Sequence, residues 1–305
     1  MISVVIPLFN KEEYIAKTLQ SVLNQTYTTF ELLVINDGST DNSLGIVNGI
    51  EDSRLRVVTL PHGGVSVARN KGIELAQYPW IAFLDADDYW SPVFLEEMIK
   101  ATQAYPEEGV FASGRSRVFM DNTERYEHEL LPAEGKTGRL DYFQVISRYL
   151  PPINSSSSLI KKELFSTEAK FRPGQRKHED HDLWIRLCKN REVIFVNSPL
   201  SYYCKTHSHA TSQDYYDASD FCTYLKTLSE VSTVISGKKK KWFQRYLNKF
   251  ILITYLQNYK GYSKQEEQMV FERARNMMDG PNGFLLKILK FLPFKLYGLL
   301  KFFKG

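Results

Sequence analysis

Short apolar runs alternate with segments of helical periodicity through the first third of the chain. Four runs rich in β-branched and aromatic residues are typical of buried strands: 2–6, 31–35, 55–60 and 80–84. Helical spacing of apolar residues predicts helices over three segments between and after them: 10–25, 65–76 and 92–105. Strands that alternate with helices in this way indicate βαβ units. The pattern predicts an α/β fold with a doubly wound, mostly parallel sheet.

The pattern changes in the second half of the chain. Further strands are predicted at 110–120 and 193–196, and a helix at 140–149. From about residue 213 the apolar residues recur only at helical spacing, with no chemical motif among them. We therefore predict a domain at 1–212 and a C-terminal helical appendix at 213–282. A separate tail helix is predicted at 283–305.

The tail has both a basic and an apolar face. Lys287, Lys290, Lys301 and Lys304 gather on one side of a helical wheel, with leucine and phenylalanine mostly opposite. The lysines oppose a bilayer crossing, and the apolar face is too rich for a solvated tail. A helix lying in the membrane interface satisfies both conditions. The alternative is a helix packed on this protein or on a second subunit, so a homodimer stays open.

Composition adds an expected location. The 305 residues carry a net charge of +4, and the excess is concentrated late, in Lys238–Lys241 and in the tail. Three cysteines have no metal-ligand spacing, which favours a reducing compartment. The first residues read as a strand and not as a secretory signal. We expect a cytoplasmic protein, peripheral on the inner face of the cell membrane, with no nucleic-acid partner.

The fourth apolar run ends in an acidic turn. Asp85, Asp87 and Asp88 fall within four positions. Adjacent carboxylates repel each other, so such a cluster is costly unless a positive charge lies among them. A divalent cation that accompanies a phosphate group would supply that charge, because hard cations take oxygen ligands. The alternative is a solvated acidic turn that precedes the next helix.

Two other turns limit the chemistry. The first strand is followed by Leu8, Phe9 and Asn10, with no glycine, which excludes a dinucleotide fingerprint and a P-loop. Asn10 and Glu13 instead read as a capping box that opens a helix.

A second polar cluster, 177–182, precedes an apolar helical run. Its acidic residues can favour a helix N-terminus, which would account for Asp182 without any catalytic role.

Together these motifs resemble those of family 2 glycosyltransferases. The matching segments, in order, are Val4–Asn10, Asn36–Asp41, Val65–Gly72, Phe83–Asp88 and Glu179–Leu187. The resemblance covers about residues 1–212. It implies a GT-A fold, a nucleotide-diphospho-sugar donor, a divalent metal (Mn²⁺ or Mg²⁺) and inversion at the anomeric carbon.

The resemblance also implies roles for individual residues. Asp85 and Asp87 would be the metal-binding pair, with Asp87 the principal ligand and His207 a further candidate; a histidine outside any cluster is often structural. Asp37 would contact the base or ribose. For Arg69, a surface ion pair is the alternative to nucleotide contact. The full set of expected donor contacts is Pro7, Phe9, Asn10, Asp37, Arg69, Asp85, Ala86 and Asp87.

On the acceptor side, Asp180 matches the position of the family's catalytic base, and Glu179 is the second candidate. A carboxylate there would take the proton of the attacking hydroxyl. Expected acceptor contacts are Asp88, Ser157 and Trp184.

One departure from the family pattern matters. No Gln-x-x-Arg-Trp motif and no transmembrane run follow the second cluster, which argues against a processive polysaccharide synthase. The sequence therefore predicts a metal-dependent hexosyltransferase that moves one sugar, from a UDP-sugar by preference, to a hydroxyl of a saccharide or lipid-linked acceptor in bacterial glycan biosynthesis. The alternatives are a nucleotidyltransferase that forms sugar nucleotides and a non-catalytic, membrane-associated protein that binds them.

Overall fold

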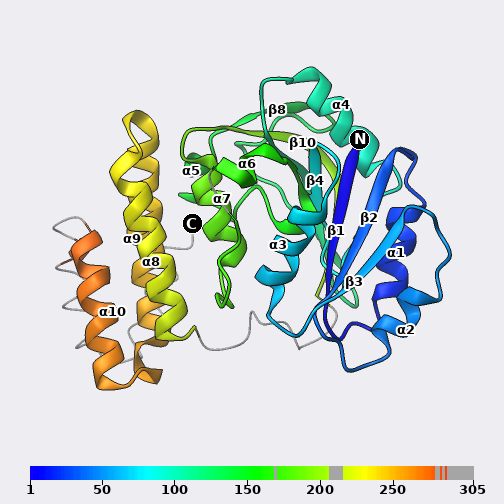
Figure 1. Ribbon diagram of the computed structural model, residues 1–305. Helices are drawn as coiled ribbons and strands as arrows, with labels where there is room; N and C mark the ends of the chain where they lie inside the picture. Colours follow the sequence, from blue (N-terminus) through cyan, green and yellow to red (C-terminus); the bar gives the residue numbers. More distant parts are fainter. Residues whose placement is uncertain (168–169, 206–215, 279–281, 284–285, 287–305) are drawn as a thin grey trace. The chain divides into compact units, whose positions relative to one another are not determined.

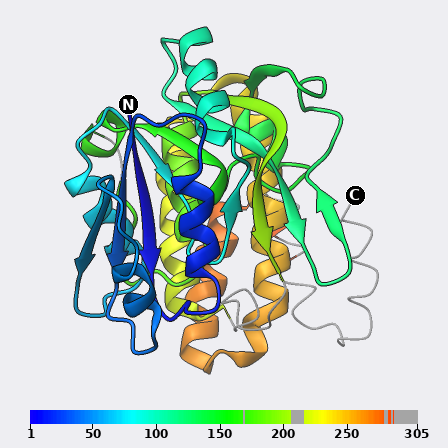
Figure 2. The ribbon, with the colours of Figure 1, turned by 90° about the vertical axis from the view of Figure 1, so that its right-hand side faces the viewer.

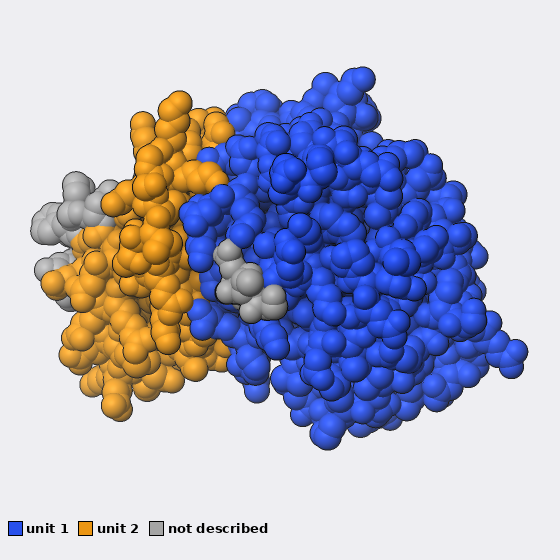
Figure 3. Space-filling model, turned by 45° about the horizontal axis from the view of Figure 1, so that its top comes forward, with its two compact units in different colours: residues 1–142, 151–210 blue, residues 143–150, 211–305 orange. Residues whose placement is uncertain are grey.

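The computed structural model describes residues 1–167, 170–205, 216–278, 282–283 and 286. The chain divides into two compact units, which Figure 3 shows in different colours. The first comprises residues 1–142 and 151–210, and the second comprises 143–150 and 211–305. Residues 143–150, which the sequence placed within the first predicted domain, thus belong to the second unit.

Ten strands of the described residues form one mixed sheet in the first unit (Figure 1). They are β1 (Ile2–Leu8), β2 (Phe30–Asn36), β3 (Leu55–Thr59), β4 (Trp80–Phe83), β5 (Tyr89–Trp90), β6 (Val110–Val118), β7 (Thr123–Arg125), β8 (Thr137–Leu140), β9 (Ser158–Lys161) and β10 (Val193–Cys204). The order is β3-β2-β1-β4-β9-β6-β10-β5, with β7 on β6 and β8 on β10. β3, β2, β1 and β4 are parallel, whereas β9 runs antiparallel to β4 and β6. The predicted α/β class is confirmed, and beyond β4 the sheet is mixed.

Helices cover both faces of the parallel half. The helices of the first unit are α1 (Ile15–Leu23), α2 (Ser43–Asn48), α3 (Val65–Leu75), α4 (Phe94–Ala104), α6 (Glu163–Thr167) and α7 (Glu179–Cys188). Val4 and Ile6 share a buried cluster with Leu19 of α1. Val5 points to the other face, where a Cβ on Gly72 of α3 would lie 2.2 Å from a Val5 methyl carbon. Because successive side chains of β1 point to opposite faces of the sheet, they determine which helix packs on each face.

The register of the parallel strands brings three loops to one edge of the sheet. Leu8 of β1 pairs with Asn36 of β2, and Val5 pairs with Phe83 of β4. Because parallel strands end at the same edge, the loops that follow β1, β2 and β4 emerge together. Figure 2 shows these strands running side by side.

Three predicted boundaries are wrong. α1 begins at Ile15 with no side-chain cap, so Asn10 does not open it. The helix predicted over 140–149 is reduced to α5 (Tyr142–Ile146). The strand predicted at 193–196 continues to Cys204, through a register shift against β6 between Val196 and Pro199.

The second unit contains the predicted helical appendix. Besides most of α5, it contains α8 (Ala218–Val234), α9 (Gly237–Asn258), the short 3₁₀ helix Tyr259–Gly261 and α10 (Lys264–Met277). The apolar residues at helical spacing are its core: Phe221, Leu225, Leu228, Phe243, Leu247, Ile251 and Leu256 are all buried. In the described part of the chain no helix is long and apolar enough to cross a membrane. Apart from Gly283 and Leu286, the predicted tail helix lies outside the described residues.

Candidate active site

The loops after β1 and β2 are joined through Asn10. Its backbone lies in the left-handed region (φ 50°). Its side-chain oxygen accepts a hydrogen bond from the Thr40 backbone N–H at 2.8 Å, and its side-chain nitrogen donates to the Thr40 hydroxyl at 3.2 Å. The Asn10 backbone N–H donates to the Ser39 hydroxyl. Asn10 thus ties two loops together, which is why it cannot cap α1.

Asp37 lies at the end of β2 with 2% of its surface exposed. Its carboxylate accepts hydrogen bonds from the backbone N–H groups of Gly63 and Gly64, both at 2.8 Å, and lies 2.9 Å from Nδ1 of His62. The imidazole of His62 stacks on the half-exposed ring of Phe9, with ring centroids 4.2 Å apart. Phe9, Asp37 and the 62–64 turn therefore form one aromatic and acidic corner at the edge of the sheet.

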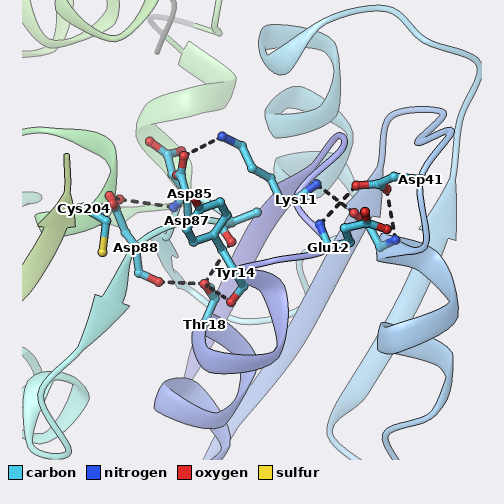
Figure 4. Close-up of polar contacts among 12 residues, drawn as sticks. Lys11, Glu12, Tyr14, Thr18, Asp41, Asp85, Asp87, Asp88 and Cys204 are labelled. Carbon is cyan, nitrogen blue, oxygen red and sulfur yellow. Dashed lines mark hydrogen bonds and ion pairs between the residues drawn. The ribbon is translucent and has the colours of Figure 1, made fainter. Parts of the chain in front are cut away.

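In the acidic turn after β4, two carboxylates each face a cation. A carboxylate oxygen of Asp85 lies 2.6 Å from Arg69. One of Asp87 lies 2.6 Å from the ammonium of Lys11, and Figure 4 shows this second pair. About a third of each aspartate side chain is exposed. Both positive charges come from other elements, Arg69 from α3 and Lys11 from the loop after β1. The protein thus supplies the compensation that a cluster of adjacent carboxylates requires.

Asp88 has a different environment. It is buried, accepts a hydrogen bond from the Ser156 hydroxyl, and accepts another from the Cys204 backbone N–H at 3.1 Å. Burial, together with the charges of Asp87 and Asp85, raises its pKa well above the usual value. Ser156 also accepts a hydrogen bond from the Asp85 backbone N–H, so this serine supports the turn from behind.

Arg69 connects the acidic turn to the second acidic cluster. Its guanidinium is 3% exposed and lies 2.6 Å from Asp85 and 3.0 Å from the carboxylate of Glu179. Burial acts to lower the pKa of Arg69, but these two carboxylates outweigh it and raise the pKa above its usual value. Asp85 and Glu179 lie 94 positions apart in the sequence, and both form ion pairs with the Arg69 side chain.

Glu179 and Asp180 occupy the first turn of α7, after His178 in the left-handed conformation (φ 57°). Burial, reinforced by the charge of Asp180, raises the pKa of Glu179 to about 7, although Arg69 opposes this shift. Burial also acts to raise the pKa of Asp180, but His181, Arg69 and the His181 backbone N–H together hold it below its usual value. The pKa values of these two adjacent carboxyl groups are thus shifted in opposite directions.

The family follows from a sequence comparison. The model of the family described as Glycosyl transferase family 2 matches residues 3–167, more than half of the chain. The chain belongs to glycosyl transferase family 2. The glycosyltransferase GlyG of Streptococcus pneumoniae is 27% identical over 67% of this chain and 70% of its own length. The chondroitin synthase of Pasteurella multocida is 37% identical over 33% of this chain but only 11% of its own length. Several other curated relatives match over about a third of this chain and less than half of their own length.

A solved structure supports the fold. The structure of Staphylococcus aureus TarS 1-349 in complex with UDP-GlcNAc superimposes with a TM-score of 0.71 at 19% identity, over 95% of this chain and 87% of that chain. The predicted GT-A architecture with a C-terminal helical region is confirmed for this glycosyltransferase.

Several residues expected to contact the donor or the acceptor are buried in this structure. Ser157 and Trp184 have no exposed surface, and Asp88 has 1%. Ser157 instead closes a capping box with Asn154, and Trp184 packs edge-on against Phe171 in the core. On the donor side, Pro7 and Ala86 are also buried; they shape the strand ends and do not line an open wall.

The residues at the acidic turn fit a hard cation only in part. Asp85 and Asp87 supply carboxylate oxygens, the ligands that Mg²⁺ and Mn²⁺ prefer. Within the described residues, no group of three His, Cys, Asp or Glu side chains is placed to hold a metal ion. His207 lies outside them. Donor phosphate oxygens would have to complete the coordination, as is usual for Mg²⁺.

Two residues of this arrangement were missed by the sequence prediction: Lys11 and His62. Each is an ordinary polar residue in a loop, and its role comes from a partner at least 25 positions away. Only the position of Lys11 directly after the Phe9-Asn10 motif could have drawn attention to it.

Proposed function

We propose that this family 2 glycosyltransferase moves a single sugar from a nucleotide-diphospho-sugar to a hydroxyl of its acceptor, with inversion at the anomeric carbon. The Arg69 bridge is the observation on which the proposal depends. It holds Asp85, at the edge where the donor would bind, and Glu179, beside the candidate base, on one guanidinium. Donor and base would then flank a single reaction centre, as a single displacement requires.

The corner at the ends of β1 and β2 suits a nucleoside. The exposed Phe9 ring and His62 present an aromatic surface on which a base can stack. Asp37 is oriented by two backbone N–H groups and retains lone pairs that could accept from an imide or from ribose hydroxyls. We favour a uracil nucleotide. TarS has the same fold, and its complex with UDP-GlcNAc supports this choice.

The diphosphate would lie at Asp85 and Asp87. When bound there, Mg²⁺ or Mn²⁺ would stabilise the negative charge that develops on the leaving nucleoside diphosphate. Lys11 and Arg69, now paired with the carboxylates, place two protein cations at the same point. Such preoriented charges favour the transition state over the bound donor.

Asp180 is the proposed general base. Its lowered pKa keeps it ionised at neutral pH, so its carboxylate can take the proton of the acceptor hydroxyl. The hydroxyl oxygen forms the new bond to the anomeric carbon as the bond to the diphosphate oxygen breaks. Glu179 is the weaker candidate, because it is engaged with Arg69 and its pKa of about 7 leaves it partly protonated.

The acceptor is proposed to be a saccharide or lipid-linked saccharide of a bacterial glycan. The basic amphipathic tail at 283–305 would then hold the enzyme at the inner face of the membrane. Deletion of residues 283–305 should reduce the share of the protein found in the membrane fraction. An unchanged distribution would contradict this role of the tail.

Thermal-shift measurements with UDP, GDP, CDP and ADP, each with Mn²⁺ or with EDTA, test the donor site. A ligand at a hundred times its Kd stabilises the protein by about 2.7 kcal/mol. We expect UDP with Mn²⁺ to raise the melting temperature most and Asp37→Asn to reduce that rise. If no nucleoside diphosphate changes the melting temperature, the proposed donor site is wrong.

A further inference from the structure

Helix α9 concentrates positive charge on one face. Between Gly237 and Asn258 it carries six basic residues and no acidic residue. Four of them, Lys238, Lys241, Arg245 and Lys249, follow one another at intervals of three or four positions, so they share a face of the helix. At 1.5 Å per residue this basic stripe is about 16 Å long. Its first three members are exposed and Lys249 is partly exposed.

The stripe has no compensation within the described part of the chain. None of its four cations forms an ion pair with a described residue. Burial, together with the charge of Arg245, lowers the pKa of Lys249, as expected for a cation whose nearest charged neighbour is also positive. Like charges at these spacings destabilise a helix, and lysines in a first turn oppose the helix dipole.

Helix α10 shows the opposite arrangement. A capping box between Ser263 and Glu266 begins it, two glutamates occupy its first turn, and Arg275 lies in its last turn. Each of these charges favours the helix. The charges of α9 therefore cannot be explained by the stability of its own helix, and an external anionic partner would compensate them.

An aromatic side chain borders the stripe. Trp242 is one turn from both Lys238 and Arg245 and is partly exposed, with the guanidinium of Arg148 5.1 Å from its ring. Tryptophan is enriched at membrane–water interfaces, where its apolar ring and its N–H group are both satisfied. Basic residues with an interfacial tryptophan favour a lipid surface over a soluble polyanion.

We propose that the α9 stripe (Lys238, Lys241, Arg245 and Lys249) binds a bilayer that contains anionic lipid. This contact depends neither on the proposed catalytic reaction nor on the tail. A basic residue near an anionic membrane surface contributes enough to raise partitioning about fivefold. Loss of all four should therefore weaken binding by about a hundredfold or more, and added salt should weaken the wild type.

Sedimentation of the full chain with phosphatidylglycerol-containing vesicles tests the proposal. The stripe variant replaces Lys238, Lys241, Arg245 and Lys249 with glutamine. The control replaces four exposed lysines from elsewhere, with the same change in net charge: Lys136, Lys170, Lys226 and Lys264. We expect the stripe variant to lose binding, the control to retain most of it, and the melting temperature of the stripe variant to be unchanged or higher.

Other outcomes overturn the proposal. An equal loss of vesicle binding in both variants would mean that only net charge matters. Unchanged vesicle binding in the stripe variant would mean that other parts of the chain bind the bilayer. Equal wild-type binding to phosphatidylcholine vesicles would exclude charge recognition. Binding to soluble polyphosphate without binding to vesicles would indicate a polymer partner.

If the stripe variant does not fold, Lys241→Gln with Arg245→Gln should still reduce binding at least tenfold. Donor hydrolysis, measured in parallel, tests the catalytic proposal separately and should not change.

Discussion

The two acidic clusters of the first unit contain the same kinds of residue in different environments. In the turn after β4, Asp85 and Asp87 each meet a cation from another element and remain partly exposed. At the start of α7, Glu179 and Asp180 are adjacent and close to a single buried arginine, and their pKa values move in opposite directions. Under the proposed mechanism, the fixed negative charge of the turn would hold the metal ion at the donor phosphates, whereas α7 would accept a proton. Carboxylate content alone does not distinguish these roles; the number of compensating cations does.

Asp180→Asn should produce the largest effect, because it removes the proposed base. A general base contributes about 10²- to 10⁴-fold to the rate, so kcat should fall by that factor. Nucleotide affinity should stay close to that of the wild type, since the turn after β4 is intact. Initial rates and thermal shifts with UDP would be measured on the same preparation. Glu179→Gln is the matched control, and a larger loss of kcat there would assign the base to Glu179.

Arg69→Met should remove the connection between the clusters. Breaking a buried ion pair by deletion of one partner costs about 3–5 kcal/mol, because the other charge stays buried and unpaired. We expect a lower melting temperature in scanning calorimetry. Arg54→Met, which breaks the more exposed pair with Asp52, should cost under about 1 kcal/mol. Equal losses of stability in the two variants would show that the ion pairs of Arg69 stabilise the protein no more than the more exposed Arg54–Asp52 pair.

The pH dependence of stability should separate Glu179 from its neighbours. Its pKa is raised to about 7 in the folded state, so the folded protein holds a proton that the unfolded chain releases above about pH 4.5. Its contribution to stability is therefore present below that unfolded value and is lost as the pH rises to 7, by up to about 3 kcal/mol. His178 and His181, whose pKa values are lowered mainly by desolvation, act in the opposite direction below about pH 6.5.

The difference between wild type and Glu179→Gln isolates this contribution. Urea unfolding at several pH values from 5 to 7.5 should show that wild-type stability, relative to the variant, declines with increasing pH. A constant difference would mean that Glu179 titrates normally in the folded protein.

Lys11→Gln should have the smallest effect. The pair between Lys11 and Asp87 is about a third exposed, so its loss should change stability by no more than about 1 kcal/mol. Nucleotide affinity should fall only modestly, because Asp87 stays available to the donor. A destabilisation as large as that of Arg69→Met would remove the contrast between an exposed and a buried ion pair.

Local patterns determined much of this protein. The alternation of apolar strands and amphipathic helices was sufficient for the α/β class, because burial of a strand or of a helix face depends on residues that are close in sequence. The apolar spacing from Phe221 onward likewise predicted the core of the second unit. The polar motifs after β1, β2 and β4 were sufficient to predict that Asn10, Asp37 and Asp85 lie at one edge of the sheet, because parallel strands end at the same edge.

Tertiary structure decided the rest. Nothing local to Asn10 shows that it bonds to Thr40 and does not cap a helix, and nothing near Ser157 or Trp184 shows that these side chains are buried. The pairing of Lys11 with Asp87, and of Arg69 with both Asp85 and Glu179, joins segments that only the folded sheet brings together. Electrostatic interactions and desolvation depend on distance in space and on exposure to water, and neither quantity can be read along a chain.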